Sequence, residues 1–302
     1  MPVTPTTPTP TPLHRPPRHP HLWLAVMLVS QLAVVAVFWR WGWTWGLPVM
    51  IATHIPYWWG TLKADSRLFS PVLHRLPTAT RQVWLTIDDG PGDDTPAMLD
   101  LLDAHGARVT FFLVGERAQA RPELVREIVR RGHDIGQHSH THPQAWFWAL
   151  GPSQMREEIA RGQATITALT GTAPRWFRAV VGMSNPFVAA SLKRHGLARA
   201  AWSARGFDGV HCEPARVVER IDRDLAPGAI VLMHEGAAHG RNVETLALLL
   251  ERLGERGYRC VLPQQIEGLP SPQPSPASGR GGGQGGSAAE ASESNSVESA
   301  NA

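Results

Sequence analysis

Residues 82–91, which read Gln-Val-Trp-Leu-Thr-Ile-Asp-Asp-Gly-Pro, decide the fold. The first six residues form an apolar run of strand-favouring residues, which indicates a buried β-strand. Two carboxylates, Asp88 and Asp89, follow this strand directly and precede a Gly-Pro turn. No glycine fingerprint for dinucleotide binding follows the strand, so the pattern favours a barrel over an open sheet.

Six further runs of strand character follow, and most segments between them have helical spacing. The seven expected strands are residues 82–87, 108–113, 133–137, 175–179, 198–202, 229–233 and 258–262. Strands that alternate with helices predict a parallel sheet with right-handed crossovers. We therefore expect an α/β fold, a closed or nearly closed (β/α)7 barrel, with a doubly wound open sheet as the alternative.

Polar side chains with catalytic potential follow five of these strands. They are Asp88 and Asp89 after the first, His138 and His142 after the third, Arg178 at the end of the fourth, Asp208 after the fifth and His234 after the sixth. The carboxyl ends of parallel strands share one face of such a fold, where active sites are built. Taken singly, each has a plainer interpretation, such as a turn or a core histidine. Their convergence on one rim favours a site.

Asp89, His138 and His142 predict a metal site. One carboxylate oxygen and two imidazole nitrogens supply three ligands and leave positions open for water and substrate. Asp88 is left over beside them and can take a proton from the attacking water. His234 arrives from another strand and can protonate a leaving group. A metal, a base and a separate acid are the requirements of amide hydrolysis.

Two segments, residues 86–91 (Thr-Ile-Asp-Asp-Gly-Pro) and 138–142 (His-Ser-His-Thr-His), resemble the first two motifs of the polysaccharide deacetylase (NodB-homology) family. The members of this family are carbohydrate esterases that remove N-acetyl groups from chitin oligomers and peptidoglycan sugars. The resemblance covers roughly residues 83–261. It implies a deformed (β/α)7 barrel and a single divalent metal ion, with zinc expected before cobalt or another divalent ion.

The same resemblance implies a role for each matching residue. The general base is Asp88, and the metal ligands are Asp89, His138 and His142. Arg178 matches the arginine that pairs with the base, and the backbone N–H of Val181 matches the expected oxyanion donor. In the segment that resembles the fifth motif, Leu232 is a wall of the acyl pocket and His234 is the general acid.

The segment that corresponds to the fourth motif departs most from the family pattern. Many members have an Asp-rich stretch that ends in Asp-Trp, whereas residues 202–209 read Trp-Ser-Ala-Arg-Gly-Phe-Asp-Gly. Asp208 is expected to replace the acidic partner, and Trp202 is expected to contact the substrate. The missing tryptophan and the extra Arg205 change the substrate wall, which affects the choice of polymer rather than the hydrolytic residues.

The amino-terminal part has the features of a membrane anchor. Residues 1–20 are Pro-rich and basic, and we expect them to be disordered. Residues 22–39 form an apolar run just long enough to span a bilayer, and residues 45–59 form a second, shorter run. Twelve Trp against two Tyr fit an anchor as well, because indole rings favour the membrane interface. We expect residues 22–60 to form an integral anchor in a bacterial-type inner membrane, as one span or a hairpin.

Charge bias decides the expected side of the membrane. Arg15 and Arg18 precede the first run, Arg40 is the basic residue between the runs, and further basic residues follow the second run. This distribution favours a hairpin that keeps the catalytic domain in the cytoplasm. The alternative is a single span with a periplasmic domain. The catalytic domain is assigned to residues 81–264, and residues 269–302 are a low-complexity tail expected to be disordered.

Composition excludes one class of partner. The net charge of +3 carries no clustered basic stripe, which argues against nucleic-acid binding. The expected partners are an acetylated amino-sugar glycan and membrane lipid, and no protein partner is inferred. We expect an N-deacetylase acting on a cell-envelope polysaccharide or a lipid-linked glycan precursor. The alternatives are a metal-retaining glycan-binding protein without activity, and an O-deacetylase or deformylase with the same machinery.

Overall fold

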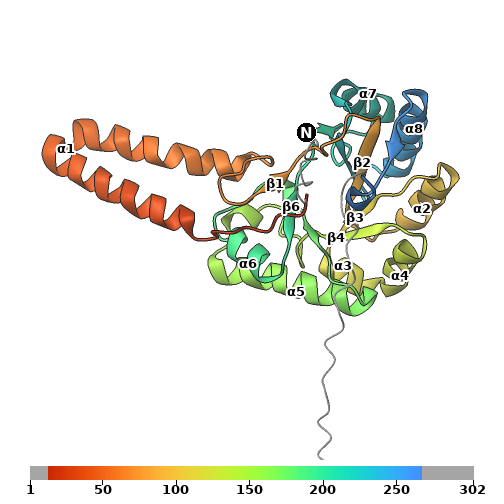
Figure 1. The fold of residues 1–302 in the computed structure, drawn as a ribbon, viewed down its shortest axis with the longest axis horizontal. Helices are drawn as coiled ribbons and strands as arrows, with labels where there is room; N and C mark the ends of the chain where they lie inside the picture. Colours follow the sequence, from red (N-terminus) through yellow and green to blue (C-terminus); the bar gives the residue numbers. More distant parts are fainter. Residues whose placement is uncertain (1–12, 267–302) are drawn as a thin grey trace, which may run out of the picture. The chain divides into compact units, whose positions relative to one another are not determined.

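A parallel sheet forms the centre of the molecule in the computed structural model, which describes residues 13–266 (Figure 1). Its nine strands within this range are β1 (Val72–Leu73), β2 (Gln82–Gly90), β3 (Thr110–Leu113), β4 (Asp134–Gln137), β5 (Trp176–Phe177), β6 (Ala198–Ala200), β7 (Ala204–Arg205), β8 (Ile230–His234) and β9 (Arg259–Cys260). The order is β1-β6-β5-β4-β3-β2-β8-β7, and β9 pairs with β2. Every ladder between these strands is parallel.

The predicted deformed (β/α)7 barrel is confirmed. From β2 to β6 the strands lie side by side in sequence order, and β8 and β7 continue from the other side of β2, so the order does not reverse as in a doubly wound sheet. All seven expected strands are present. The sequence does not predict β1 and β7, because strands of two residues are too short to leave a periodicity in it.

Seven helices of the described chain follow the strands of this sheet: α2 (Thr95–Ala104), α3 (Gly115–Ala120), α4 (Pro122–Arg130), α5 (Pro152–Thr170), α6 (Val188–Arg194), α7 (Pro214–Asp224) and α8 (Asn242–Glu255). Proline occupies the first turn of α2, α4, α5 and α7, where its missing N–H costs no helical hydrogen bond. Gly171, with φ 70°, ends α5 in the left-handed conformation that glycine adopts without strain.

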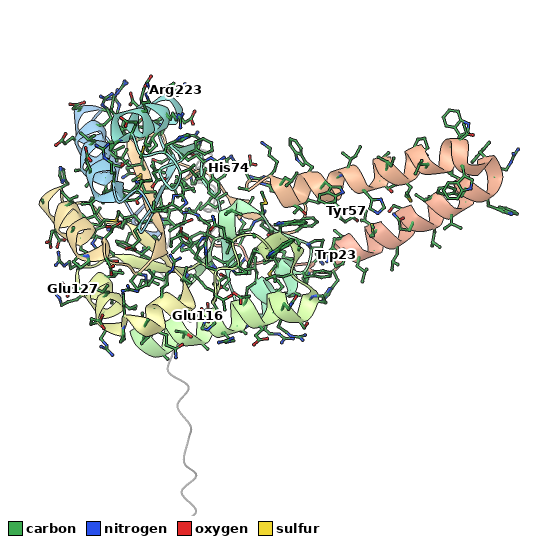
Figure 2. The ribbon with its side chains drawn as sticks, turned by 180° about the vertical axis from the view of Figure 1, so that it is seen from behind. Trp23, Tyr57, His74, Glu116, Glu127 and Arg223 are labelled. Carbon is green, nitrogen blue, oxygen red and sulfur yellow. The ribbon has the colours of Figure 1, made fainter. Side chains whose placement is uncertain are left out.

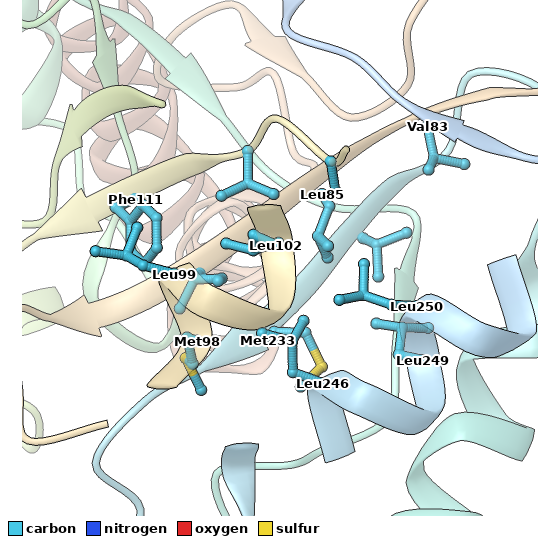
Figure 3. Packing of buried hydrophobic residues seen from close by; sticks show 14 of the residues in the cluster. Val83, Leu85, Met98, Leu99, Leu102, Phe111, Met233, Leu246, Leu249 and Leu250 are labelled. Atoms are coloured by element: carbon cyan, nitrogen blue, oxygen red, sulfur yellow. The ribbon is translucent and has the colours of Figure 1, made fainter. Parts of the chain in front are cut away.

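The main core lies between the central strands and the helices that cover them. In Figure 3, side chains from β2, α2 and α8 interleave, among them Leu85, Leu102 and Leu246, all fully buried. Truncation of such a leucine to alanine costs about 2–5 kcal/mol, because the cavity closes only in part. This packing fixes β2 and β8 side by side, and it therefore fixes the residues at their carboxyl ends.

Helix α1 (Leu22–Leu62) is a hairpin and not one straight helix. Gly42 has φ 67° and ψ −163° and breaks its 41 residues into two arms, which Figure 1 shows folded back on each other. Two hydrogen bonds join the arms: Gln31 donates to Thr53 at 3.5 Å, and the Tyr57 hydroxyl donates to the Trp23 carbonyl at 3.0 Å. Among the described helices, this one alone is long and apolar enough to cross a membrane.

The segment before α1 differs from the expectation of disorder. His14 bonds the Arg175 carbonyl at 3.0 Å and stacks edge-on against Trp176, and Leu13 packs on a core cluster. Residues 13–20 therefore run along the domain. The rest of the predicted amino-terminal segment and the predicted tail at 269–302 lie outside the described residues.

Candidate active site

The end of β2 presents its two carboxylates in different directions. The pairing of β2 with β3 shifts its register between Asp88 and Gly90, so that Asp89 is an extra residue, and Asp89 has φ 74°. Such a bulge turns a side chain away from the regular alternation of a strand. Asp88 stays in register and pairs with His234 of β8. The side chains of these two adjacent aspartates therefore point in different directions and can have different roles.

Asp89, His138 and His142 come together as a three-ligand cluster, with their ligand atoms within 4.8 Å of one another. The Asp89 Oδ1 atom lies 2.9 Å from His142 Nε2 and 3.5 Å from His138 Nε2. His138 follows β4 directly. His142 returns toward it with φ 55°, and its amide donates to the Ser139 hydroxyl at 3.1 Å.

The donor set fits a divalent cation. Asp89 Oδ1 is buried, and no side chain of the described range donates to it in hydrogen-bonding geometry, although two imidazole nitrogens lie close by. His138 Nδ1 lies 2.8 Å from the Arg178 carbonyl oxygen, which can only accept, so Nδ1 carries the proton and Nε2 presents its lone pair. Two imidazoles and a carboxylate with open positions are typical of a catalytic zinc site.

Electrostatics keep this cluster in its ligating state. Burial alone would raise the pKa of Asp89, but the close approach of the His142 imidazole and the charges of His138 and His142 lower it well below its usual range. Burial lowers the pKa of His138, and Asp88 and Asp89 oppose this shift. An ionised carboxylate and a neutral imidazole are the forms that bind metal.

Arg178 holds Asp88 in place. The guanidinium, fully buried, donates to Asp88 Oδ1 at 2.7 Å, to the Thr86 hydroxyl at 2.7 Å and to the Ala201 carbonyl at 3.1 Å. The second carboxylate oxygen, Oδ2, lies 3.8 Å from His138 Nε2 and therefore faces the cluster. One oxygen of Asp88 is thus bound by the Arg178 guanidinium, and the other faces the Asp89–His138–His142 cluster.

His234 is paired with Asp208. Its Nδ1 lies 2.9 Å from Asp208 Oδ1, and its backbone N–H donates to Oδ2 of the same carboxylate at 2.6 Å. Burial would lower the pKa of His234, but Asp208 together with Asp88 and Asp89 raises it to about 9. His234 is therefore protonated at neutral pH, as a proton donor must be. Its Nε2 is the nitrogen that remains available.

The loop after β5 carries the expected oxyanion donor. Val181 has φ 49° in a short 3-10 turn, Val180–Gly182, and is partly exposed. The next two amides donate to Ala179 and Val180, whereas the backbone bonds of the described chain give the Val181 amide no acceptor. A methyl group on Gly182 would collide with the ring of Trp202, which places Trp202 against this loop.

Leu232 lies in β8, two residues before His234, and is buried. The other nine expected site residues lie at or just after the carboxyl ends of the strands, on one rim: Asp88, Asp89, His138, His142, Arg178, Val181, Trp202, Asp208 and His234. Whether each performs its expected role stays a prediction.

Three supporting residues were missed. The carbonyl of Asp208 accepts from His239 at 2.7 Å and from Asn242 at 3.4 Å, which fixes the loop that carries the carboxylate. Arg117 bonds the Asp89 carbonyl. None of these contacts has a local signal, because each joins segments that are far apart in the chain.

Glu235 directly follows β8, and its side chain connects this strand to the turn after Asp89 by hydrogen bonds. We call this contact the Glu235 clamp. Its Oε2 accepts from the Thr95 hydroxyl at 2.5 Å and from the Gly92 amide at 3.1 Å. Burial raises the pKa of this carboxyl to about 7, although both hydrogen bonds oppose the shift. The sequence pattern carries no signal for this clamp, because Glu235 and Thr95 are far apart in the chain.

The chain is similar in sequence and in fold to known proteins. The family model described as polysaccharide deacetylase matches residues 75–200. Over 202 residues the chain is 33% identical to a chitooligosaccharide deacetylase of Bradyrhizobium sp. (strain ANU 289), covering 62% of this chain and 91% of that protein. Over 201 residues it is 30% identical to a peptidoglycan-N-acetylglucosamine deacetylase of Bacillus cereus, covering 65% and 92%.

Among solved structures, the family 4 carbohydrate esterase from Streptomyces lividans, in complex with acetate, superposes with a TM-score of 0.56. It is 30% identical, over 62% of this chain and 96% of that one. The chain belongs to the polysaccharide deacetylase family, as the two motifs predicted. It is a glycan deacetylase, a hydrolase of amide carbon–nitrogen bonds.

Proposed function

We propose that the chain is a metal-dependent hydrolase that removes N-acetyl groups from amino sugars of a cell-envelope polysaccharide or a lipid-linked glycan precursor. The observation that carries the proposal is the buried Asp89 oxygen without a donor, surrounded by His138 and His142, with Asp88 and His234 at adjacent strand ends. The relatives named for chitooligosaccharides and peptidoglycan support an acetylated amino sugar as the substrate class.

Asp89, His138 and His142 would hold the cation, and zinc suits this set of nitrogen and oxygen donors best. A divalent ion bound there supplies polarisation of the acetyl carbonyl and acidification of water. Oδ2 of Asp88 accepts the proton of the attacking water, while Arg178 keeps Oδ1 occupied and the carboxylate oriented.

The remaining steps use groups on the other side of the acetyl carbon. The amide N–H of Val181 donates to the carbonyl oxygen as it gains negative charge. His234, held by Asp208, gives its Nε2 proton to the sugar nitrogen as the carbon–nitrogen bond breaks. The products are acetate and the free amino sugar. Leu232 and Trp202 line the acetyl and sugar sides of the site.

The α1 hairpin is proposed as an integral membrane anchor. Each arm is roughly 30 Å long at 1.5 Å per residue, which equals the thickness of the bilayer hydrocarbon. Tryptophans gather at both ends, with Trp41 and Trp43 beside the bend and Trp58 and Trp59 at the base. A hairpin leaves both of its ends on one side, and the basic residues that flank it support the cytoplasmic side of an inner membrane.

Acetate release by the full chain in detergent tests the proposal, with chitin oligomers, peptidoglycan fragments and acetylated xylan as substrates. We expect release from the first two, its loss on chelation and its return with zinc or cobalt. His138→Ala should neither bind zinc nor release acetate, whereas His105→Ala, an exposed control directly after α2, should do both. Activity in the metal-free protein, or release from xylan alone, would contradict the proposal.

A further inference from the structure

The base of the α1 hairpin borders the active site. The Thr61 carbonyl at the end of its second arm accepts from the Ser184 amide at 3.2 Å. Ala64, just beyond the hairpin, lies so close to Gly182 that a Cβ there would come within 2.9 Å of the Ala64 Cβ. Gly182 is the residue next to Val181, the expected oxyanion donor. The base of the hairpin therefore lies against the loop that carries part of the site.

Both arms of the hairpin make contacts of this kind. Trp23 of the first arm packs edge-on against Phe187, with ring centroids 5.4 Å apart, and Trp58 of the second arm lies 6.2 Å from Trp148. Figure 2 shows Trp23 and Tyr57 facing each other across the two arms. Phe187 and Trp148 belong to the loops after β5 and β4. Both loops are therefore in contact with the base of the hairpin.

Exposed apolar side chains lie on the rim of the site. From residue 70 to the end of the described chain, five large hydrophobic side chains are exposed, and four of them lie in loops that follow the site strands. They are Trp146, Val181, Phe207 and Val210, and the exception is Val129 on α4. Val210 is 79% exposed and lies two residues after Asp208. An exposed apolar rim beside a membrane anchor fits contact with lipid.

Arg205 lies on the same rim, and its guanidinium has no ion-pair partner among the described residues. Its guanidinium stacks on Phe207 at 4.0 Å and on Trp202 at 5.3 Å from the ring centroids. Trp202 in turn lies 5.8 Å from the Arg178 guanidinium inside the site. The described residues give Arg205 no carboxylate and no hydrogen-bond acceptor. A guanidinium held by aromatic faces with its N–H groups free is suited to phosphate.

We propose that the substrate is a membrane-embedded glycolipid, in which the acetylated amino sugar is joined to the lipid through phosphate or diphosphate. The hairpin and the apolar rim hold the mouth of the site at the bilayer surface, and Arg205 binds the phosphate. This inference rests on the proposed deacetylase function and selects the lipid-linked substrate over the mature polymer.

The test uses the full chain and three substrates. They are a neutral chitin oligomer, a soluble N-acetylglucosamine diphosphate ester, and N-acetylglucosaminyl diphospho-polyprenol in phosphatidylcholine vesicles. Arg205→Gln should lower the ratio of kcat/KM for either diphosphate to that for the neutral oligomer by about 10-fold or more, since each lost charge-assisted bond is costly. Arg205→Lys should restore part of it. Arg223→Gln, an exposed control on α7, should leave the ratio unchanged.

A second pair of variants tests the lipid contact. Val210→Asp should lower kcat/KM for the vesicle substrate relative to the soluble diphosphate by about 10-fold, whereas Val129→Asp should not. An unchanged ratio in Arg205→Gln overturns the phosphate site, and equal effects of the two valine variants overturn the membrane contact. If the wild-type protein releases acetate from none of the three substrates, the proposed function fails together with this inference. Release from the neutral oligomer alone overturns only the inference.

Discussion

Replacement of Asp208 by asparagine should move the alkaline limb of the pH–activity profile. The carboxylate of Asp208 lies 2.9 Å from His234 Nδ1 and is the strongest of the charges that raise the pKa of His234 to about 9. Asparagine keeps the shape but removes the charge, so the pKa should fall toward the ordinary imidazole value of about 6.5. Because His234 must be protonated to act as the acid, activity then ends at a lower pH.

The size of the effect depends on pH. With a pKa of about 9, roughly 90% of His234 is protonated at pH 8, whereas with a pKa near 6.5 about 3% of it is protonated. The value of kcat/KM at pH 8 should therefore fall about 30-fold in Asp208→Asn. At pH 6 the two enzymes should differ less than about 2-fold from this cause. The assay is acetate release from chitin oligomers between pH 5 and 10. Asp222→Asn, remote from the site and paired with Arg252 and Arg256, is the matched control. A limb that stays near pH 9 in Asp208→Asn would refute the assignment of His234 as the acid.

Three further variants test the groups around the site. Arg178→Met should leave Asp88 buried without a partner and lower the free energy of unfolding by about 3–5 kcal/mol, measured by urea denaturation. Gly182→Ala should lower kcat more than stability, because φ 75° and the Trp202 ring both oppose a methyl group there. The methyl group should displace the neighbouring loop with the oxyanion donor. An unchanged kcat would argue against a role for that loop. Glu235 has a raised pKa, so its stabilising contribution is complete below about pH 4.5 and is lost as the pH rises through about 7. In thermal scans, Glu235→Gln should therefore flatten this part of the dependence of stability on pH. A variant with the same pH dependence as the wild-type protein would contradict the clamp.

The sequence predicted the barrel and the residues at the carboxyl ends of its strands, and the reason is physical. Apolar strands followed by short polar motifs carry a local signal, and the parallel topology then brings the ends of those strands to one face. Asp88, Asp89, His138 and His142 were therefore found from their positions in the chain alone. The family resemblance supplied Val181 and Leu232, together with the role of Arg178.

The sequence did not predict features that depend on tertiary contacts. The bulge at Asp89, the His239 and Asn242 bonds to Asp208 and the Glu235 clamp join segments that are distant in the chain. The two short strands β1 and β7 exist only because neighbouring strands pair with them. The fold of α1 back on itself also depends on such contacts, because hydrogen bonds join its two arms across the break at Gly42.

The most direct test of the central claim separates metal binding from proton abstraction in one variant. Asp88→Asn should bind one zinc ion per chain by calorimetric titration, because Asp89, His138 and His142 remain, yet release acetate about 10²-fold or more slowly for want of a general base. Asp89→Asn should lose both zinc and activity. An Asp88→Asn protein that keeps its zinc and deacetylates at the wild-type rate would contradict the account.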